Sequence, residues 1–188
     1  TVRRQLEQFL AALFRPGELI ELRFIESWAA NGRQHSRVVR PAQWLQRQDL
    51  ISQYSEIIGS ARRERANVYF GVCPRSREGM ARDEQIKTVR CLWCDLDHVS
   101  AEEAFRRWTR AHVVPPSFVT RSGSGIHGYW LLDRDVRSLS TLRLVTAMLP
   151  HFYRSFDGDH VQNLSRVMRL PGTFNCKDAR NGRRPIRC

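Results

Sequence analysis

Lysine is almost missing from this chain of 188 residues, since only Lys87 and Lys177 occur among its 31 basic side chains. The other basic residues are arginines, whose planar guanidinium suits bidentate contacts to phosphate. Genome base composition accounts for part of an arginine bias, but not for a net charge of +12. The composition therefore predicts a polyanionic partner. An anionic membrane is less favoured because no basic amphipathic helix stands out.

Long apolar runs are also missing, because no stretch of about 18 apolar residues occurs and nothing is expected to span a membrane. No secretory signal peptide is visible. The five cysteines are odd in number and irregular in spacing, which does not suit a disulfide framework and indicates a reducing, cytoplasmic compartment. Cys91 and Cys94 form a single C-x-x-C on a predicted strand, where they would point to opposite faces. We therefore expect buried thiols there and no zinc.

No internal repeat or low-complexity linker divides the chain, and 41% hydrophobic residues suffice for a core. In the first half, patterning predicts a helix over 3–14, strands at 18–25 and 36–40, a helix from Pro41 to Gly59 and a strand over 67–73. Residues 75–82 read as a basic, mobile loop. The chain starts at Thr1 and ends as a further extended segment begins, so we expect a catalytic domain cut from a longer protein.

The second half has the order β-α-β-β-α-β, the split βαβ arrangement of RNA-recognition folds. The predicted strands are 88–95, 117–120, 127–132 and 184–188, with helices over 100–112 and 136–156. In this arrangement the first and third strands are antiparallel neighbours. The end of the first strand, with Asp95 and Asp97, should therefore lie beside His127 at the start of the third.

Asp95 and Asp97 are two residues apart, so on an extended strand both point to the same face. Two carboxylates aimed at one point repel each other unless a cation lies between them. Hard oxygen ligands favour Mg²⁺ or Mn²⁺ over zinc. An isolated D-x-D is common by chance, but here it follows an apolar stretch, where two solvated acids are less expected.

Two further groups of polar residues strengthen this interpretation. The turn Arg121-Ser122-Gly123-Ser124-Gly125, followed by His127, offers backbone and side-chain donors to an anion, although an ordinary hairpin has the same composition. Arg166 and Arg169 would share one face of a helical turn, unless they are solvated surface arginines. Either Asp157 or Asp159 is placed to complete a three-carboxylate metal site, while an Asp-Gly turn is the structural alternative.

Together these residues resemble the archaeo-eukaryotic primase (AEP) superfamily, in its primase-polymerase branch found in plasmids, phages and mobile elements. Three motifs occur here in the family's order: the acidic pair Asp95 and Asp97, then Ser124 to His127 with Tyr129 and Trp130 after it, then Asp159 with the run from Ser165 to Asn175. The stretch from Val68 to Arg75 is similar to a strand that precedes the first motif. The resemblance spans roughly residues 18 to 188.

The resemblance implies an α+β fold, with an N-terminal α/β lobe (1–85) and an RRM-like palm (86–188) around one active site. It implies that Asp95, Asp97 and Asp159 hold two Mg²⁺ or Mn²⁺ ions, with Asp157 competing for the third place. It further implies that His127 contacts the nucleotide's phosphates. The candidate nucleotide-binding residues are then Ser122, Ser124, His127, Arg166 and Arg169, with Arg121 and Arg75 as weaker ones. The expected partners are a single-stranded DNA template and primer, an NTP or dNTP, and a helicase or other replication domain, in a nucleoid or mobile-element replication complex.

The implied function is template-dependent addition of nucleotides to a 3′-hydroxyl. Two alternatives stay open. One is a metal-dependent nuclease, since acidic clusters with arginine also suit strand cleavage. The other is a non-catalytic RRM-like binding module, which would display aromatic side chains such as Tyr129 and Trp130 to nucleic acid. A rolling-circle initiator is disfavoured because the sequence has no His-x-His pair.

Overall fold

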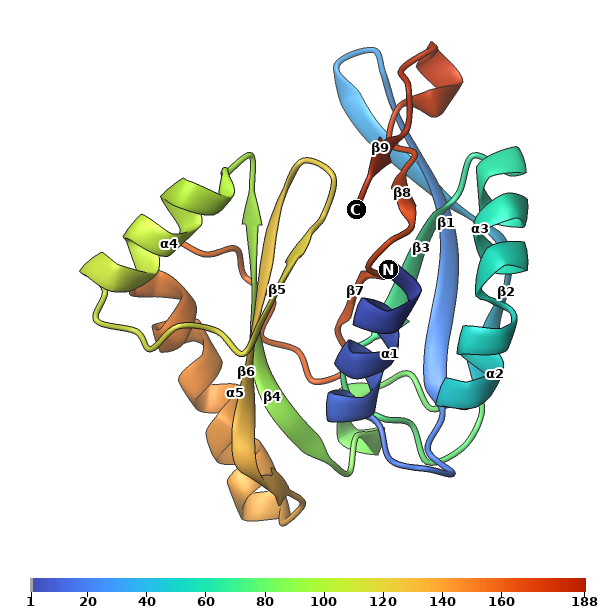
Figure 1. The fold of residues 1–188 in the computed structure, drawn as a ribbon. Helices are drawn as coiled ribbons and strands as arrows, with labels where there is room; N and C mark the ends of the chain where they lie inside the picture. The colour runs from blue at the N-terminus through green and yellow to red at the C-terminus, as the bar shows by residue number, and fades with distance from the viewer. Residues whose placement is uncertain (1) are drawn as a thin grey trace.

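Two antiparallel sheets form the framework of the computed structural model, which describes residues 2–188 (Figure 1). The first sheet has the strand order β2-β1-β3-β7, with β1 (Ile20–Ala30), β2 (Arg33–Leu45), β3 (Asn67–Gly71) and β7 (Val167–Arg169). The second has the order β4-β6-β5, with β4 (Val89–Asp97), β5 (Phe118–Arg121) and β6 (Gly125–Val136). Strands β8 (Phe174–Asn175) and β9 (Ile186–Arg187) form a separate ribbon.

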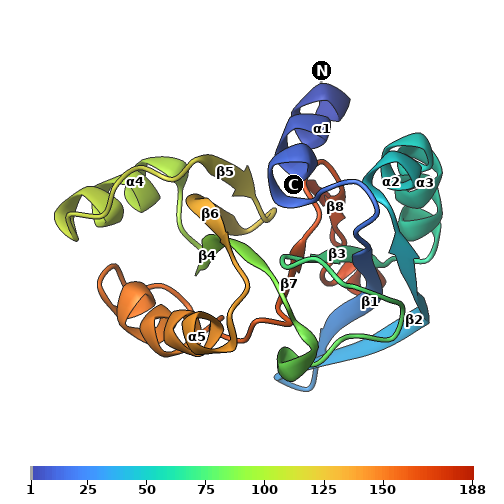
Figure 2. The same cartoon turned by 90° about the horizontal axis from the view of Figure 1, so that it is seen from below.

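Helices α2 to α5 lie on the outer sides of the two sheets, and one helix lies between the sheets (Figure 2). Helices α4 (Ala101–Arg110) and α5 (Leu139–Arg154) lie on the second sheet, where Trp108 packs edge-on against Trp130 at 5.5 Å. Helices α2 (Arg47–Ser52) and α3 (Tyr54–Arg63) lie beside the first sheet, and short 3₁₀ helices occur at Asp83–Gln85 and Ala179–Asn181. Among residues 2–188, every helix is too short or too polar to cross a membrane.

Helix α1 (Val2–Leu13) lies between the two sheets, because its buried face of Leu6, Phe9, Leu10 and Leu13 needs cover on both sides. The Phe9 ring contacts Phe70 of β3, Phe118 of β5 and Tyr129 of β6, at centroid distances of 5.6, 5.5 and 4.9 Å. The aromatic centre therefore joins both lobes.

The α+β class and the first five elements of the predicted β-α-β-β-α-β order are confirmed, but the predicted last strand does not lie in the expected sheet. Strand β7 pairs with β3 of the first sheet, in the register Tyr69↔Arg169. The predicted final strand is present only as β9, which pairs with β8. The palm sheet thus has three strands, and the expected boundary at residue 85 does not separate the two sheets cleanly.

The predicted helix starting at Pro41 is wrong, because Pro41 lies in β2. Strand β2 is an edge strand, and its pairing with β1 shifts register between Leu22 and Phe24, opposite Pro41. A proline lacks the backbone N–H of a strand interior and is tolerated at an edge or bulge. The helix begins six residues later, at Arg47.

Candidate active site

The antiparallel pairing of β4 with β6 brings the predicted acids and histidine together. Asp95 lies opposite His127, and Asp97 opposite Gly125. His127 Nε2 is 3.4 Å from Asp95 Oδ1, without hydrogen-bond geometry. Only glycine fits at position 125, because a Cβ there would lie 2.1 Å from the Leu96 carbonyl oxygen. The glycine of the predicted turn therefore allows the close strand approach that positions the acids.

A cavity of about 280 Å³ opens between the two sheets at this point. Its palm wall carries two carboxylates, an imidazole and a hydroxyl, and the facing wall on β7 and the turn before it carries two guanidinium groups. The lining residues are Tyr69, Asp95, Asp97, Ser122, His127, Arg166, Val167, Met168 and Arg169. A carboxylate wall thus faces an arginine wall.

Asp95 is the most perturbed acid of this cavity. Burial, and then the charges of Asp97 and Asp159, raise its pKa to about 7, against the opposing effect of Arg166 and Arg169. Its Oδ1 is buried and accepts no hydrogen bond from residues 2–188. A buried carboxylate that lacks a donor and has acidic neighbours fits a cation ligand, and its oxygens suit Mg²⁺ or Mn²⁺. Within residues 2–188, however, no three carboxylate, imidazole or thiol groups are already grouped as a metal site.

His127 is neutral at physiological pH. Burial, followed by the charges of Arg169 and Arg166, lowers its pKa to about 3. Its Nδ1 lies 3.4 Å from the hydroxyl of Tyr129, which is itself fully buried. The imidazole therefore offers hydrogen bonding to a ligand without adding a charge.

The facing arginines come from a strand and a turn, so the predicted helical turn for Arg166 and Arg169 is wrong. Arg169 ends β7, and Arg166 precedes that strand. Arg169 bonds to the side-chain oxygen of Asn67 and stacks over Tyr69 at 5.0 Å. The Nε atoms of both arginines are buried and make no hydrogen bond to residues 2–188, which leaves donors for an anion.

Asn67 positions the arginine wall and was missed from the sequence. It is fully buried, accepts from Arg169 and from the backbone N–H of Cys176, and donates to the carbonyl of Ile25. The available signal was a polar residue at the head of an otherwise apolar strand, β3.

The geometry favours Asp159 over Asp157 as the acid beside the pair. The Asp159 N–H donates to the Asp95 carbonyl at 3.0 Å, and its Oδ2 accepts from the Asp97 N–H at 3.2 Å. Asp157 instead has a left-handed φ of 56° in the turn that ends α5, where the Gly158 N–H donates to the Tyr153 carbonyl. This is a Schellman-type helix end, so Asp157 has a structural position. Asp159 lies beside the cavity and does not line it.

Arg75 does not reach the cavity, which corrects its expected role in phosphate binding. Its side chain is fully buried and forms an ion pair with buried Glu21 at 2.8 Å. Arg75 also donates to the carbonyls of Cys73 and Ser165. A Cβ at Gly71 would lie 2.7 Å from its guanidinium, so the neighbouring glycine makes room for it. Arg75 is a structural residue.

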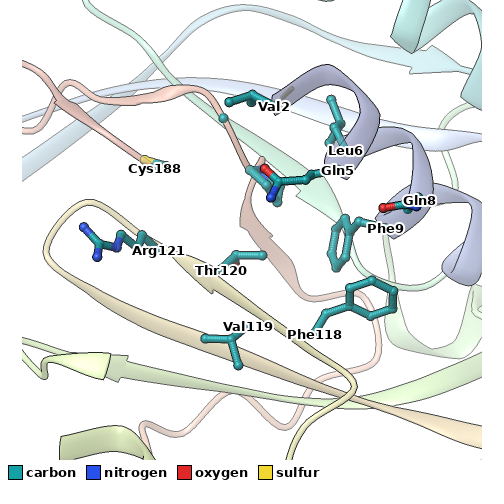
Figure 3. Close-up of a pocket in the computed structure, with 12 residues that line it drawn as sticks. Val2, Gln5, Leu6, Gln8, Phe9, Phe118, Val119, Thr120, Arg121 and Cys188 are labelled. Atoms are coloured by element: carbon teal, nitrogen blue, oxygen red, sulfur yellow. The ribbon is translucent and has the colours of Figure 1, made fainter. Parts of the chain in front are cut away.

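Arg121 and Ser124 lie on the far side of the turn from the carboxylates. Arg121 lines a cavity of about 360 Å³ between α1 and β5, where it lies beyond Thr120 on the strand (Figure 3). Arg121 and Ser124 together line another of about 330 Å³, shared with Arg187 of β9. Of the predicted turn residues, only Ser122 reaches the acidic cavity, with a buried hydroxyl that has no hydrogen-bond partner within residues 2–188.

The aromatic residues that a binding module would display are not on the surface. Tyr129 is 0% exposed and Trp130 is 5% exposed. Cys91 and Cys94 are buried free thiols, and burial raises the pKa of Cys94 to about 12. The central strands therefore present acids and a histidine to the cleft.

Two lobes around a cleft, with acids and a histidine on one antiparallel strand pair, make up the α+β fold of this chain. The chain is similar in structure to the AEP domain of the cyanophage S-2L primase-polymerase (PrimPol). The TM-score is 0.65 at 21% sequence identity, over 98% of this chain and 88% of that one. The predicted resemblance is thereby confirmed at the level of the fold. No family model and no curated protein sequence matches the chain.

Proposed function

We propose that the protein is a template-dependent nucleotidyltransferase, a DNA primase or polymerase that adds NTPs or dNTPs to a 3′-hydroxyl. The observation that carries this proposal is the cavity in which Asp95 and Asp97 face Arg166 and Arg169. Such opposed walls suit a ligand that is anionic and bound together with cations, as a nucleoside triphosphate is. The likeness in fold to a primase-polymerase domain supports the same conclusion.

Each wall has a distinct task in this proposal. Arg166 and Arg169 would hold phosphate oxygens through charge-assisted hydrogen bonds, and neutral His127 and Ser122 would orient them. Asp95 and Asp97, with Asp159 beside them, would hold divalent cations. The chemistry supplied by such cations is a lowered pKa of the attacking hydroxyl and neutralisation of charge on the leaving pyrophosphate. The positions of the side chains would supply the rest of the catalysis.

The proposed partners are a single-stranded DNA template with its primer and, in the full-length protein, a helicase or other replication domain. The net charge of +12 supports a nucleic-acid partner. Phosphate contacts of this kind are independent of sequence, so template recognition is expected to rest on base pairing with the primer and nucleotide.

Primer extension on a labelled single-stranded template tests the proposal, with NTPs or dNTPs and with Mg²⁺ or Mn²⁺. We expect Asp95→Asn and Asp97→Asn each to lower incorporation by about a hundredfold or more, because each removes charge at the reacting centre. Asp159→Asn should act in the same direction. Asp157→Asn is the matched control and should retain activity, since asparagine tolerates the left-handed φ there.

Binding of the template, measured without nucleotide or metal, should survive in all four variants. Full incorporation by a variant that carries both Asp95→Asn and Asp97→Asn would refute the assignment. Cleavage of the template without added nucleotide would show a nuclease instead.

A further inference from the structure

A strongly basic surface lies outside the cavity, where the tip of the β1–β2 ribbon meets the C-terminal segment (Figure 1). We call this surface, formed by residues 26–37 and 177–187, the basic platform. Its basic residues are Arg33, Arg37, Lys177, Arg180, Arg183, Arg184 and Arg187. All seven side chains are exposed.

The basic platform has a defined structure, because hydrogen bonds join its two segments across about 150 residues of sequence. The N–H of Asp178 donates to the Ser27 carbonyl at 2.9 Å, and Asp178 Oδ1 accepts from the Ala29 N–H at 2.6 Å. The side chain of Asn181 donates to the Ala29 carbonyl at 2.7 Å. The C-terminal segment thus occupies the part of β1 that extends beyond β3.

Both acidic residues of the platform form ion pairs with arginines of the platform itself. Glu26 is buried and binds both Arg180 at 2.7 Å and Arg37 at 3.0 Å. Asp178 is buried and lies 3.5 Å from Arg183. Seven basic and two acidic side chains leave an excess of five positive charges. Among residues 2–188, no carboxylate lies within 4 Å of Arg33, Lys177, Arg184 or Arg187.

Stacked rings accompany this charge. The Arg180 guanidinium lies 3.9 Å from the centroid of the Trp28 ring. The imidazole of His35 stacks on Trp28 at 5.6 Å and 16°, and His35 is exposed. Aromatic rings beside a basic track are the features that bind single-stranded nucleic acid, through stacked bases and contacted phosphates.

The platform extends to the β5–β6 turn, on the side of that turn away from the carboxylates. Ile186 and Arg187 of β9 line a cavity of about 330 Å³ together with Arg121 and Ser124 of the β5–β6 hairpin. Figure 1 shows β9 and the C-terminus between the two lobes. A single strand of nucleic acid lying on the platform would therefore reach the turn that borders the candidate active site.

We propose that the basic platform binds single-stranded nucleic acid, with Arg33, Lys177 and Arg184 contacting phosphates and His35 stacking against a base. The direction of the strand toward the active site rests on the proposed function, whereas binding itself does not. An anionic membrane is the competing partner, but the platform offers stacked polar rings in place of an apolar face for insertion.

The experiment measures binding of the full chain to a fluorescein-labelled oligothymidylate, in EDTA and without nucleotide. The test variant carries Arg33→Ala, Lys177→Ala and Arg184→Ala. The matched control carries Arg110→Ala, Arg143→Ala and Arg154→Ala, which removes three exposed arginines from α4 and α5 on the far side of the palm sheet. Equal melting temperatures would show that both variants fold.

We expect the test variant to bind about tenfold more weakly or worse at 0.1 M salt, while the control binds nearly as well as the wild type. The slope of log affinity against log salt should flatten by about 2, because each phosphate contact on a single strand contributes about 0.7. His35→Ala should weaken binding of the oligothymidylate by about fivefold and leave binding of an abasic oligonucleotide unchanged.

Unchanged affinity and slope in the test variant would overturn the proposal. Binding of the same proteins to phosphatidylserine vesicles is measured alongside. If the test variant loses vesicle binding and retains DNA binding, the proposal is overturned and the platform is a membrane surface. Failure of the proposed function is distinguishable, because the wild type would then bind the oligonucleotide on its platform and incorporate no nucleotide.

Discussion

At the scale of single residues, the ionisation of Asp95 has a consequence for stability. Its pKa is 3.8 without perturbation and about 7 in the folded protein. Between these values the folded state holds a proton that the unfolded state has lost, so stability falls as pH rises from about 4 to 7. Ionised Asp95 therefore destabilises the metal-free protein at pH 8.

We accordingly predict that Asp95→Asn, measured by urea unfolding in EDTA, stabilises the protein at pH 8 and much less at pH 5. The difference between the two pH values should be on the order of 2 kcal/mol. Adding Mn²⁺ at pH 8 should raise the midpoint of the wild type more than that of the variant, because the ligand binds the folded state. A variant with the same advantage at pH 5 as at pH 8 would contradict this explanation.

The residues that the sequence could predict are those that share a local pattern. Asp95 and Asp97 follow from the period of a strand, and His127 follows from the strand order. Arg75 could not be assigned, because its partner Glu21 is 54 residues away and a local pattern does not show which arginine is buried. Asn67 was missed for the same reason, since its bonds to Arg169 and Cys176 span more than 100 residues.

At the scale of elements, the site depends on how closely β4 and β6 approach. Gly125→Ala places a methyl group 2.1 Å from the Leu96 carbonyl oxygen, and that oxygen belongs to backbone that cannot turn away. We predict a loss of about 1–3 kcal/mol or more in the free energy of unfolding. Because Gly125 pairs with Asp97, incorporation per folded molecule should fall as well.

Gly59→Ala is the control for this prediction, because it is expected to raise the free energy of unfolding. Gly59 lies inside α3, where an added Cβ would meet only the flexible end of Arg63 at 3.4 Å. Alanine there should stabilise the helix by about 0.5–1 kcal/mol. Chemical denaturation of both variants measures whether the free energy of unfolding falls for Gly125→Ala and rises for Gly59→Ala. A Gly125→Ala protein as stable as the wild type would show that β4 and β6 can move apart at no cost.

Elements with an uninterrupted local pattern were predictable, whereas the second half of β2 and the shortest strands were not. The strand pair β4–β6 and the helix opening at Ser100 follow from the local patterns over 88–95, 127–132 and 100–112. Strands β7, β8 and β9 have only two or three residues each, so their partners are decided by tertiary contacts. The backbone of Leu170, for example, donates to the carbonyl of Val68, which extends the attachment of β7 to the first sheet.

At the scale of the whole molecule, charge and aromatic packing join the two lobes. Buried Arg90 at the start of β4 binds Glu18 at 2.7 Å and Asp135 at 2.9 Å, and it also donates to the carbonyl of Leu13 at the end of α1. This network lies at one end of the lobe interface, while Phe9 lies within its core. The cavity walls come from different lobes, so their spacing depends on these contacts.

Phe9 gives the sharpest test of this coupling, because its ring touches one residue of the first sheet and two of the second. We predict that Phe9→Ala lowers the free energy of unfolding by about 3–5 kcal/mol, through lost burial and the cavity left behind. Phe9→Leu keeps most of the apolar volume and should lose less. If the lobes unfold as one unit, circular dichroism and tryptophan fluorescence will give coincident transitions in both variants. Two separated transitions in Phe9→Ala would mean that each lobe is stable alone and that the arginine wall is held against the carboxylate wall by other contacts.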